Sequence, residues 1–178
     1  MNGIKLDFIK IPDDIPFLYK TMLSEDQYLY STKLRFYSIQ TFQHWLECRL
    51  GRDFHDFYII RDSSGLSQIG YVHNYDFSLI DGHCKLVVYI ISKYRETGFG
   101  GIAAIEFMKT LFFLYPLRKL FSTIYEYNKE SLKSNLAAGF ELEGIIKDYR
   151  YFDGKYHNIY YLSIEKEKFE KTIGKLVK

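Results

Sequence analysis

Three glycines lie within four positions in the segment 94–101, which reads Tyr-Arg-Glu-Thr-Gly-Phe-Gly-Gly. Glycine lets the backbone turn tightly and brings peptide N–H groups close to a ligand. If a helix begins inside this segment, its first turn adds unpaired N–H groups and a dipole that favours negative charge. The segment therefore predicts a phosphate-binding loop, for which a pyrophosphate is a natural ligand.

Two common nucleotide-binding loops fit this segment poorly. It does not end in the Gly-Lys-Ser/Thr sequence that binds nucleoside triphosphates, and no acidic residue follows about twenty positions later to hold a ribose. ATP and NAD are therefore poor candidates. A plain connection between a strand and a helix is the remaining alternative to a phosphate loop.

The segments on both sides are the elements that must position this loop. Residues 86–91 form a short run of aliphatic, β-branched and aromatic side chains, which is typical of a buried strand. Apolar side chains then recur at helical spacing from Ala104 to Tyr115, and Pro116 ends the pattern. The sequence thus predicts a strand, the glycine loop and a helix, in that order.

The rest of the chain alternates between strand and helix patterns. Strands are expected at 4–8, 57–61, 68–77, 83–91, 120–127, 140–152 and 155–164. Helices are expected after Pro12-Asp13-Asp14, at 41–50 capped by Thr41, and at 129–138 capped by Asn128. This mixed order predicts an α/β (α+β) fold class.

The connections and ends of the chain complete this outline. Asp81-Gly82 and Asp153-Gly154 are predicted hairpin turns. Residues 24–39 are expected to be helix and loop covering a pocket. Residues 1–168 are expected to form a single domain, followed by a charged tail at 169–178, and the last residues from 165 onward are expected to form a solvated helix.

Composition limits the classes of partner. The chain of 178 residues carries 24 basic and 22 acidic side chains, a formal net charge of +2, so nothing in its charge favours nucleic acid or a membrane. Cys48 and Cys84 lie far apart, which predicts no disulfide framework, no metal site and a reducing compartment, the cytoplasm. Residues 1–10 have no long apolar core behind a basic start, so they are not expected to be a signal peptide, and no apolar run approaches the length of a membrane span.

Two groups of residues carry a resemblance to a known family. Arg95, Gly98 and Gly100 resemble the Arg-x-x-Gly-x-Gly signature of the GNAT acetyl-coenzyme A-dependent N-acetyltransferases. About forty residues further on, a second group resembles the branch that acetylates ribosomal-protein alanine, spermidine or amino sugars; it consists of Asn128, Ser131, Gly139-Phe140 and Glu143-Gly144, followed by a tyrosine-rich hairpin. The resemblance covers residues 55–165. It implies a GNAT fold, a single mixed, mostly antiparallel twisted sheet with splayed central strands flanked by helices.

The resemblance also implies how acetyl-coenzyme A would bind as co-substrate. The strand end would pair with the pantetheine arm and direct one N–H at the thioester oxygen, and the loop amides would hold the pyrophosphate. Asn128 would bind the cofactor arm, with a pure capping role as the alternative. The implied cofactor-binding residues are Tyr89, Ile90, Ile91, Arg95, Glu96, Thr97, Gly98, Phe99, Gly100, Gly101, Asn128 and Ser131.

Catalysis in the family is direct attack of an amine on the thioester, without a covalent enzyme intermediate. An alkyl ammonium with a pKa of about 10.4 must first lose a proton, so a base or a water chain should help. The family's usual base is a glutamate and its usual acid a tyrosine. Lys85 and Asn135 stand at those positions here, and neither can do the same proton chemistry.

Asp76 and His83 are the remaining catalytic candidates. If Asp81-Gly82 is a two-residue turn, strand pairing puts Asp76 opposite Val87, on the same face as His83. The alternative is that both side chains are merely solvated, or that Asp76 pairs with Lys85. The aromatic side chains of the last hairpin either line an acceptor pocket or pack within the sheet; they are Tyr149, Tyr151, Tyr156, Tyr160 and Tyr161.

The sequence thus favours a cytoplasmic N-acetyltransferase that acts on a small primary amine, such as an amino sugar or polyamine. The alternatives are a protein N-terminal acetyltransferase, an inactive acetyl-coenzyme A-binding sensor or scaffold, and a structural interaction domain without cofactor. The expected partners are the amine acceptor and a second copy in a homodimer, with no nucleic acid and no membrane.

Overall fold

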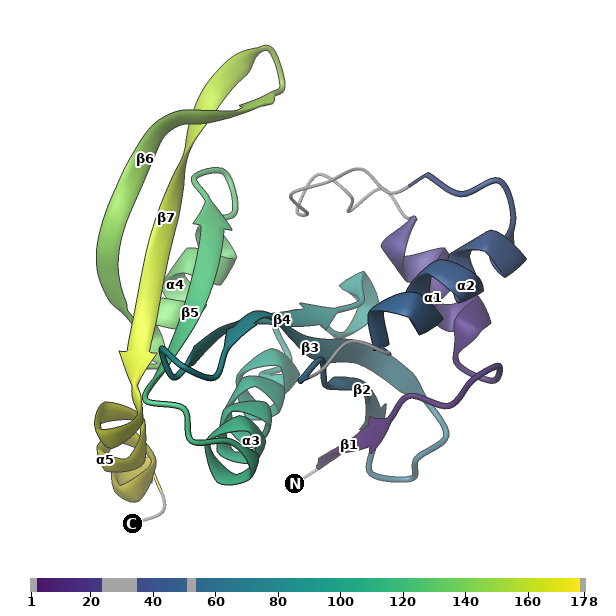
Figure 1. The fold of residues 1–178 in the computed structure, drawn as a ribbon, viewed down its shortest axis with the longest axis horizontal. Coiled ribbons are helices and arrows are strands. Elements are labelled where there is room, and N and C mark those ends of the chain that lie inside the picture. Colours follow the sequence, from purple (N-terminus) through teal and green to yellow (C-terminus); the bar gives the residue numbers. More distant parts are fainter. Residues whose placement is uncertain (1–2, 24–34, 51–53, 177–178) are drawn as a thin grey trace. The chain divides into compact units, whose positions relative to one another are not determined.

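The computed structural model describes residues 3–23, 35–50 and 54–176 (Figure 1). These residues form strands and helices in a mixed order. The elements are β1 (Ile4–Phe8), α1 (Ile15–Met22), α2 (Ile39–Leu50), β2 (Phe57–Asp62), β3 (Gln68–Ser78), β4 (His83–Ile90), the 3₁₀ turn η2 (Ser92–Tyr94), α3 (Phe99–Leu114), β5 (Lys119–Tyr125), α4 (Lys129–Ala137), β6 (Glu141–Phe152), β7 (Lys155–Glu165) and α5 (Lys166–Leu176). Most of the expected strands and helices are confirmed to within a few residues.

The strands form a mixed sheet in the order β1-β2-β3-β4-β5-β7-β6. The pairs β1–β2, β2–β3, β5–β7 and β6–β7 are antiparallel, and β4 pairs with β5 in parallel. This mostly antiparallel sheet confirms the predicted fold class. Contacts divide the chain into two compact units: a first unit of residues 1–74 and 87–107, and a second unit of residues 75–86 and 108–178.

The first unit is built around an aromatic and aliphatic core beneath two helices. Helices α1 and α2 contribute buried side chains such as Leu18 and Phe42, which cluster with Ile59 of β2 and Tyr71 of β3. Tyr89 of β4 joins the same cluster. The helices form because their apolar side chains recur on one face, and this face covers the strands.

Helix α1 begins at Ile15, directly after the predicted start signal, whereas the start of α2 differs slightly from the sequence prediction. Helix α2 begins at Ile39, and the side chains of Ser38 and Thr41 each accept from the other's backbone N–H at 3.2 Å. The predicted cap at Thr41 is therefore wrong, because Ser38 takes that role and Thr41 lies in the first turn. Of the stretch expected to cover a pocket, residues 24–34 lie outside the described residues.

In the second unit, strands β5 and β7 carry a core that helix α5 helps to cover. Leu120, Leu162 and Ile164 are almost fully buried, and Phe169 of α5 packs on Phe112 of α3 with ring centres 5.3 Å apart. The end of the chain is helical, as expected. It is not wholly solvated, however, because burial of Phe169 anchors it.

The two predicted hairpin turns had different outcomes. Asp153 and Gly154 both have positive φ, 50° and 77°, as a two-residue turn between β6 and β7 requires. The connection between β3 and β4 instead spans residues 79–82, and the hydroxyl of Ser78 donates to Asp81 Oδ2 at 2.6 Å across it. The predicted two-residue turn at Asp81-Gly82 is therefore wrong.

Within the described part of the chain, every helix is too short or too polar to cross a membrane.

Candidate functional site

The glycine loop leads directly into helix α3 in the first unit. Helix α3 begins at Phe99, and the N–H of Ile102 donates to the carbonyl of Gly98 at 3.2 Å as its first helical bond. Gly100 and Gly101 therefore lie in the first turn, where backbone N–H groups have no partner inside the helix. The predicted order of strand, loop and helix is confirmed, so the loop has the geometry of an anion site.

The three glycines have different physical roles. Gly98 has φ of +86°, a conformation that a residue with a side chain rarely adopts. A Cβ on Gly100 would lie 3.4 Å from Ile90 Cγ1, which is close to an ordinary van der Waals contact. A Cβ on Gly101 would meet nothing within 4 Å. Only Gly98 is required by the backbone conformation.

Arg95 ties the loop to the end of β4. Its Nε donates to the carbonyl of Ile90 at 3.1 Å, and its guanidinium carbon lies 5.7 Å from the centre of the Tyr89 ring. The loop also closes on itself, since Thr97 Oγ1 donates to the carbonyl of Tyr94 at 2.7 Å. Arg95 thus adds a positive charge beside the loop and holds it against the strand.

The end of β4 fits closely against β3, because of a glycine that sequence reasoning missed. A Cβ on Gly70 would lie 1.9 Å from the carbonyl oxygen of Tyr89, so no side chain is possible at this position. The N–H of Ile91 donates to the carbonyl of Ile69 at 3.0 Å. Strand alternation then directs the N–H of Ile90 away from β3. A lone glycine in a strand pattern was the signal of this close approach.

Asn128 and Ser131 lie at the start of helix α4 in the second unit. Asn128 Oδ1 accepts from the backbone N–H of Ser131 at 3.3 Å, which confirms Asn128 as the helix cap. Asn135 Nδ2 donates back to the carbonyl of Ser131 at 2.9 Å. The cap occupies the side-chain oxygen of Asn128, and the same side chain carries a separate amide donor.

Lys85 lies on the second unit's portion of β4, between an acid and two tyrosines. Its Nζ is 2.7 Å from Asp76 Oδ2, and it lies 5.9 Å and 5.7 Å from the ring centres of Tyr75 and Tyr161. Burial opposes the ammonium charge, but the hydrogen bond to Asp76 and the charges of Asp76 and both tyrosines outweigh it and raise the pKa of Lys85. Lys85 is therefore protonated at neutral pH and is no base.

The structure changes the argument for the two catalytic candidates. The longer β3–β4 connection removes the premise that placed Asp76 opposite Val87. Asp76 pairs with Lys85 instead, which confirms that alternative, and its side chain is 61% exposed. His83 packs edge-on against Phe121, with ring centres 5.4 Å apart. The two candidates therefore make separate contacts, one with Lys85 and the other with Phe121.

Among the described residues, no group of three or more His, Cys, Asp or Glu side chains is arranged to hold a metal ion.

Comparison with known proteins finds one curated relative and a set of solved structures with a similar fold. No family model matches the chain. The chain is 23% identical over 137 residues to the SPbeta prophage-derived uncharacterized N-acetyltransferase YokL of Bacillus subtilis, covering 77% of this chain and 76% of that protein.

Solved structures give a closer match in shape than in sequence. Spermidine N-acetyltransferase from Vibrio cholerae, solved with CoA and spermine, superimposes with a TM-score of 0.85 at 15% identity, over 94% of this chain and 98% of that one. The spermidine/spermine N-acetyltransferase SpeG from the same organism, solved with manganese ions, gives a TM-score of 0.80 at 15% identity, over 94% and 95%. The chain therefore has the GNAT fold of the spermidine N-acetyltransferases, as its sequence predicted.

Proposed function

We propose that this chain is an N-acetyltransferase that moves the acetyl group of acetyl-coenzyme A to the primary amine of a small molecule. The observation that carries the proposal is the loop of residues 95–101, which opens helix α3 and is held to β4 by Arg95. The GNAT fold, an N-acetyltransferase relative and a neighbour solved with CoA support it.

The loop amides and Arg95 would hold the pyrophosphate, and the end of β4 would hold the pantetheine arm. The N–H of Ile91 already donates within the sheet, so we assign the thioester contact to the N–H of Ile90. A preorganised donor of this kind is worth about 3 to 4 kcal/mol of transition-state stabilisation. Asn128 and Ser131 complete the proposed set, together with Tyr89 and residues 96–101.

The reaction would be direct attack of the amine nitrogen on the thioester carbon. The carbon–sulfur bond breaks, the thiolate leaves and takes up a proton, and the amine loses one. Lys85 holds its proton and cannot accept that of the amine. We therefore propose Asp76 as the base or water-positioning group, with His83 as the other candidate. One carboxylate oxygen of Asp76 contacts Lys85, and the carboxylate has a second oxygen and is exposed.

A second candidate function is an acetyl-coenzyme A sensor or scaffold without turnover. Lys85 and Asn135 favour it, because they replace the family's usual base and acid. A protein N-terminus is the alternative acceptor for an active enzyme. Cytoplasmic location, the homodimer and the domain boundary at residue 168 stay predictions.

The first test uses two glycines with the same backbone conformation. Gly98 and Gly65 both have positive φ and open space around the position of a Cβ, but Gly65 lies in the β2–β3 turn. Valine at either position should cost similar stability, because β-branched residues avoid positive φ. Only Gly98→Val should weaken coenzyme A binding, by about tenfold or more, since it displaces donors to a charged group.

Isothermal titration with coenzyme A measures that affinity, and a thiol-release assay with acetyl-coenzyme A and pooled amines measures turnover. Binding with thiol release supports the enzyme, and binding without release supports the sensor. Equal affinity of wild type and Gly98→Val would contradict the loop as the cofactor site.

A further inference from the structure

The side chain of Lys85 lies in a cluster of groups that suits a primary ammonium ion. Its Nζ is 2.7 Å from Asp76 Oδ2, and it lies 5.9 Å from the centre of the Tyr75 ring and 5.7 Å from the centre of the Tyr161 ring. These residues come from β3, β4 and β7, and all of them belong to the second unit. A single ammonium group therefore meets one carboxylate and two aromatic rings.

The backbone at Asp76 explains how two consecutive side chains reach the same ammonium group. In a regular strand, neighbouring side chains point to opposite faces of the sheet. Asp76 has φ of +52°, which is outside the range of a regular strand, and both Tyr75 and Asp76 approach Lys85. Irregularities of this kind in a strand often re-aim a side chain, so the cluster is a specified feature of the fold.

The neighbouring strand β5 connects the two rings. The hydroxyl oxygen of Tyr75 lies 3.3 Å from Thr123 Oγ1, within hydrogen-bond distance, and Thr123 is also the residue that pairs with Tyr161 of β7. Both rings are thus tied to one position in the sheet. A site whose walls are already in place costs less entropy when a ligand binds.

The cluster favours a positive charge. Burial lowers the pKa of Lys85, but the hydrogen bond and charge of Asp76 and the charges of Tyr75 and Tyr161 outweigh it, so the pKa is raised. The Lys85 side chain is 22% exposed and that of Asp76 is 61% exposed, so the ammonium is largely withdrawn from water while the carboxylate stays accessible. Aromatic faces and carboxylates are the groups that recognise ammonium ligands in proteins.

We propose that Tyr75, Asp76 and Tyr161 form a binding site for a primary alkylammonium ion, and that Lys85 is its internal occupant, which competes with free amines. The tether to β4 gives the lysine a high effective concentration at the site, so a free amine binds only by displacing it. This site does not depend on acetyl transfer. Because Asp76 is also the proposed base, the same competition would limit how closely a cationic amine approaches it.

The test removes the internal occupant and supplies the missing atoms as a free ligand. Lys85→Ala deletes the part of the side chain beyond Cβ, which corresponds to propylammonium. Propylamine is protonated at neutral pH, because the pKa of an alkyl ammonium is about 10.4. An NMR titration should show saturable binding of propylammonium to Lys85→Ala with roughly millimolar affinity, as expected for so small a ligand, and at least about tenfold tighter than to the wild type.

Control ligands separate recognition of the charge from general effects. 1-Propanol has a similar length without the charge and should not bind to Lys85→Ala. Sodium chloride at equal concentration matches the ionic strength, so that any change caused by screening appears in both titrations.

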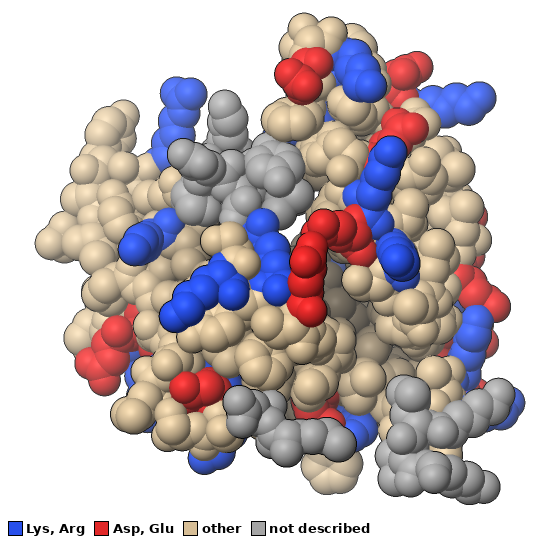
Figure 2. All heavy atoms as spheres, turned by 180° about the vertical axis from the view of Figure 1, so that it is seen from behind, with Lys and Arg blue, Asp and Glu red and all other residues tan. Residues whose placement is uncertain are grey.

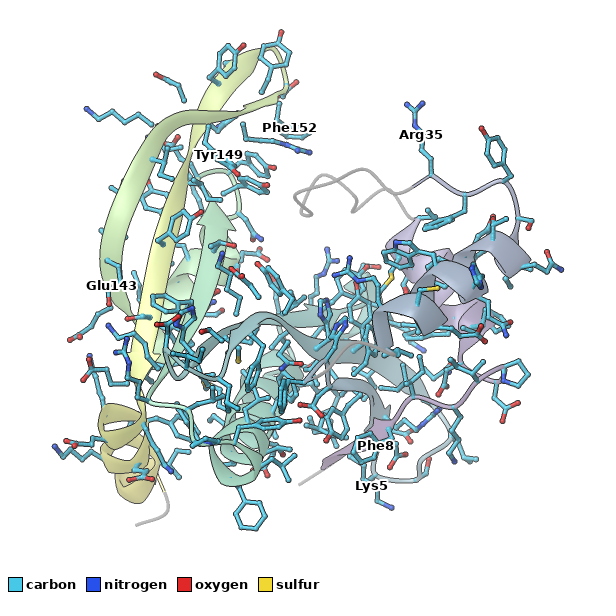
Figure 3. All side chains as sticks on the ribbon, viewed as in Figure 1. Lys5, Phe8, Arg35, Glu143, Tyr149 and Phe152 are labelled. Carbon is cyan, nitrogen blue, oxygen red and sulfur yellow. The ribbon has the colours of Figure 1, made fainter. Side chains whose placement is uncertain are left out.

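Control variants separate the site from the rest of the surface. Adding Asp76→Asn to Lys85→Ala should weaken propylammonium binding by about tenfold or more, the usual effect of a lost charged hydrogen bond. Adding Tyr161→Leu should also weaken it, because a ring face is lost. Lys155→Ala removes an exposed lysine opposite Phe152, which Figure 3 shows near the tip of the β6–β7 hairpin, and this variant should bind no better than the wild type.

A second measurement uses the wild type and does not require Lys85→Ala to fold. NMR of isotope-labelled lysine ammonium groups should show slow hydrogen exchange at Lys85 Nζ, because this group is hydrogen-bonded to Asp76 and mostly buried. Asp76→Asn should remove this protection. The ammonium group of the exposed Lys155 should exchange fast and serves as the reference.

Binding of propylammonium to Lys85→Ala that Asp76→Asn weakens would support the site, whether or not thiol is released from acetyl-coenzyme A. Absent thiol release would overturn only the proposed enzyme. Equal affinity of the wild type and Lys85→Ala for propylammonium, equal binding of 1-propanol, or a Lys85 ammonium group that exchanges as fast as that of Lys155 would overturn the proposed site.

Discussion

At the scale of single residues, His73 shows how burial sets a proton affinity. It stacks face to face on Phe57 with ring centres 5.2 Å apart, and its Nδ1 lies 3.4 Å from Nε2 of His55. Burial is the largest cause that lowers the pKa of His73, and the charges of His55 and Arg49 lower it further. A hydrogen bond with the backbone of Asn74 raises it, but the net effect is a pKa of about 3. The folded protein therefore keeps this imidazole neutral.

This burial predicts acid sensitivity. In the unfolded chain His73 binds a proton when the pH falls below its ordinary pKa of about 6.5. In the folded chain it binds a proton only when the pH falls to about 3. Between these values the unfolded state holds more protons, so stability falls as the pH falls, by up to about 1.4 kcal/mol per pH unit. Urea unfolding from pH 7.5 to 4.5 should show a shallower decline in the free energy of unfolding for His73→Phe.

The control for that series is His44→Gln, because His44 is an exposed histidine on α2. This variant should follow the wild-type pH dependence. If His73→Phe and the wild type lost stability in parallel, the assignment of the acid sensitivity to His73 would be wrong.

A second prediction for a single residue concerns Asp76 as the proposed base. Asparagine tolerates the positive φ of 52° at this position, so Asp76→Asn should fold normally while it removes the carboxylate charge and the ion pair with Lys85. If Asp76 is the base, kcat should fall by about a hundredfold or more, with the affinity for coenzyme A unchanged. Asp153→Asn is the control, because Asp153 has φ of 50° in the β6–β7 turn. Wild-type kcat in Asp76→Asn would move the assignment to His83.

At the scale of elements, the close approach of β3 and β4 depends on a single hydrogen atom at Gly70. Alanine there places a methyl carbon 1.9 Å from the carbonyl oxygen of Tyr89, so the strands must move apart. We expect Gly70→Ala to lower the free energy of unfolding by roughly 1 to 3 kcal/mol, the usual cost of overpacking. It should also weaken coenzyme A binding, because Tyr89 and Ile90 shift.

Gly144→Ala is the matched control for this prediction, since a Cβ on Gly144 in β6 meets nothing within 4 Å. Urea unfolding and coenzyme A titration measure both variants. Equal stability of the two proteins would show that β3 and β4 are less tightly packed than the structure indicates.

The two Asp-Gly dipeptides show how far element prediction reaches. Asp153-Gly154 formed the expected turn, because both residues adopt positive φ and nothing else competes for them among the described contacts. At Asp81-Gly82 the hydroxyl of Ser78 donates to the carboxylate of Asp81, and Arg118 Nε donates to its carbonyl at 2.9 Å. These contacts with other residues favour a longer loop, and the dipeptide alone does not reveal them.

At the scale of the whole molecule, charge gives little guidance to the substrate. The formal net charge is +2, and Figure 2 shows basic and acidic side chains interspersed on the visible face. A mixed surface of this kind exerts no strong long-range attraction on a charged acceptor. The net charge therefore does not distinguish between acidic, neutral and basic acceptors.

The sequence by itself determined the features that depend on neighbours along the chain: the glycine loop between strand and helix, the Asn128 cap and the Asp153-Gly154 turn. Tertiary structure alone decided which distant groups meet. It joined Asp76 to Lys85, Gly70 to Tyr89, and both Tyr149 and Arg150 to one ring. The physical reason is register, because a bulge or a loop longer by two residues changes which side chains lie opposite each other while leaving the local hydrophobic pattern unchanged.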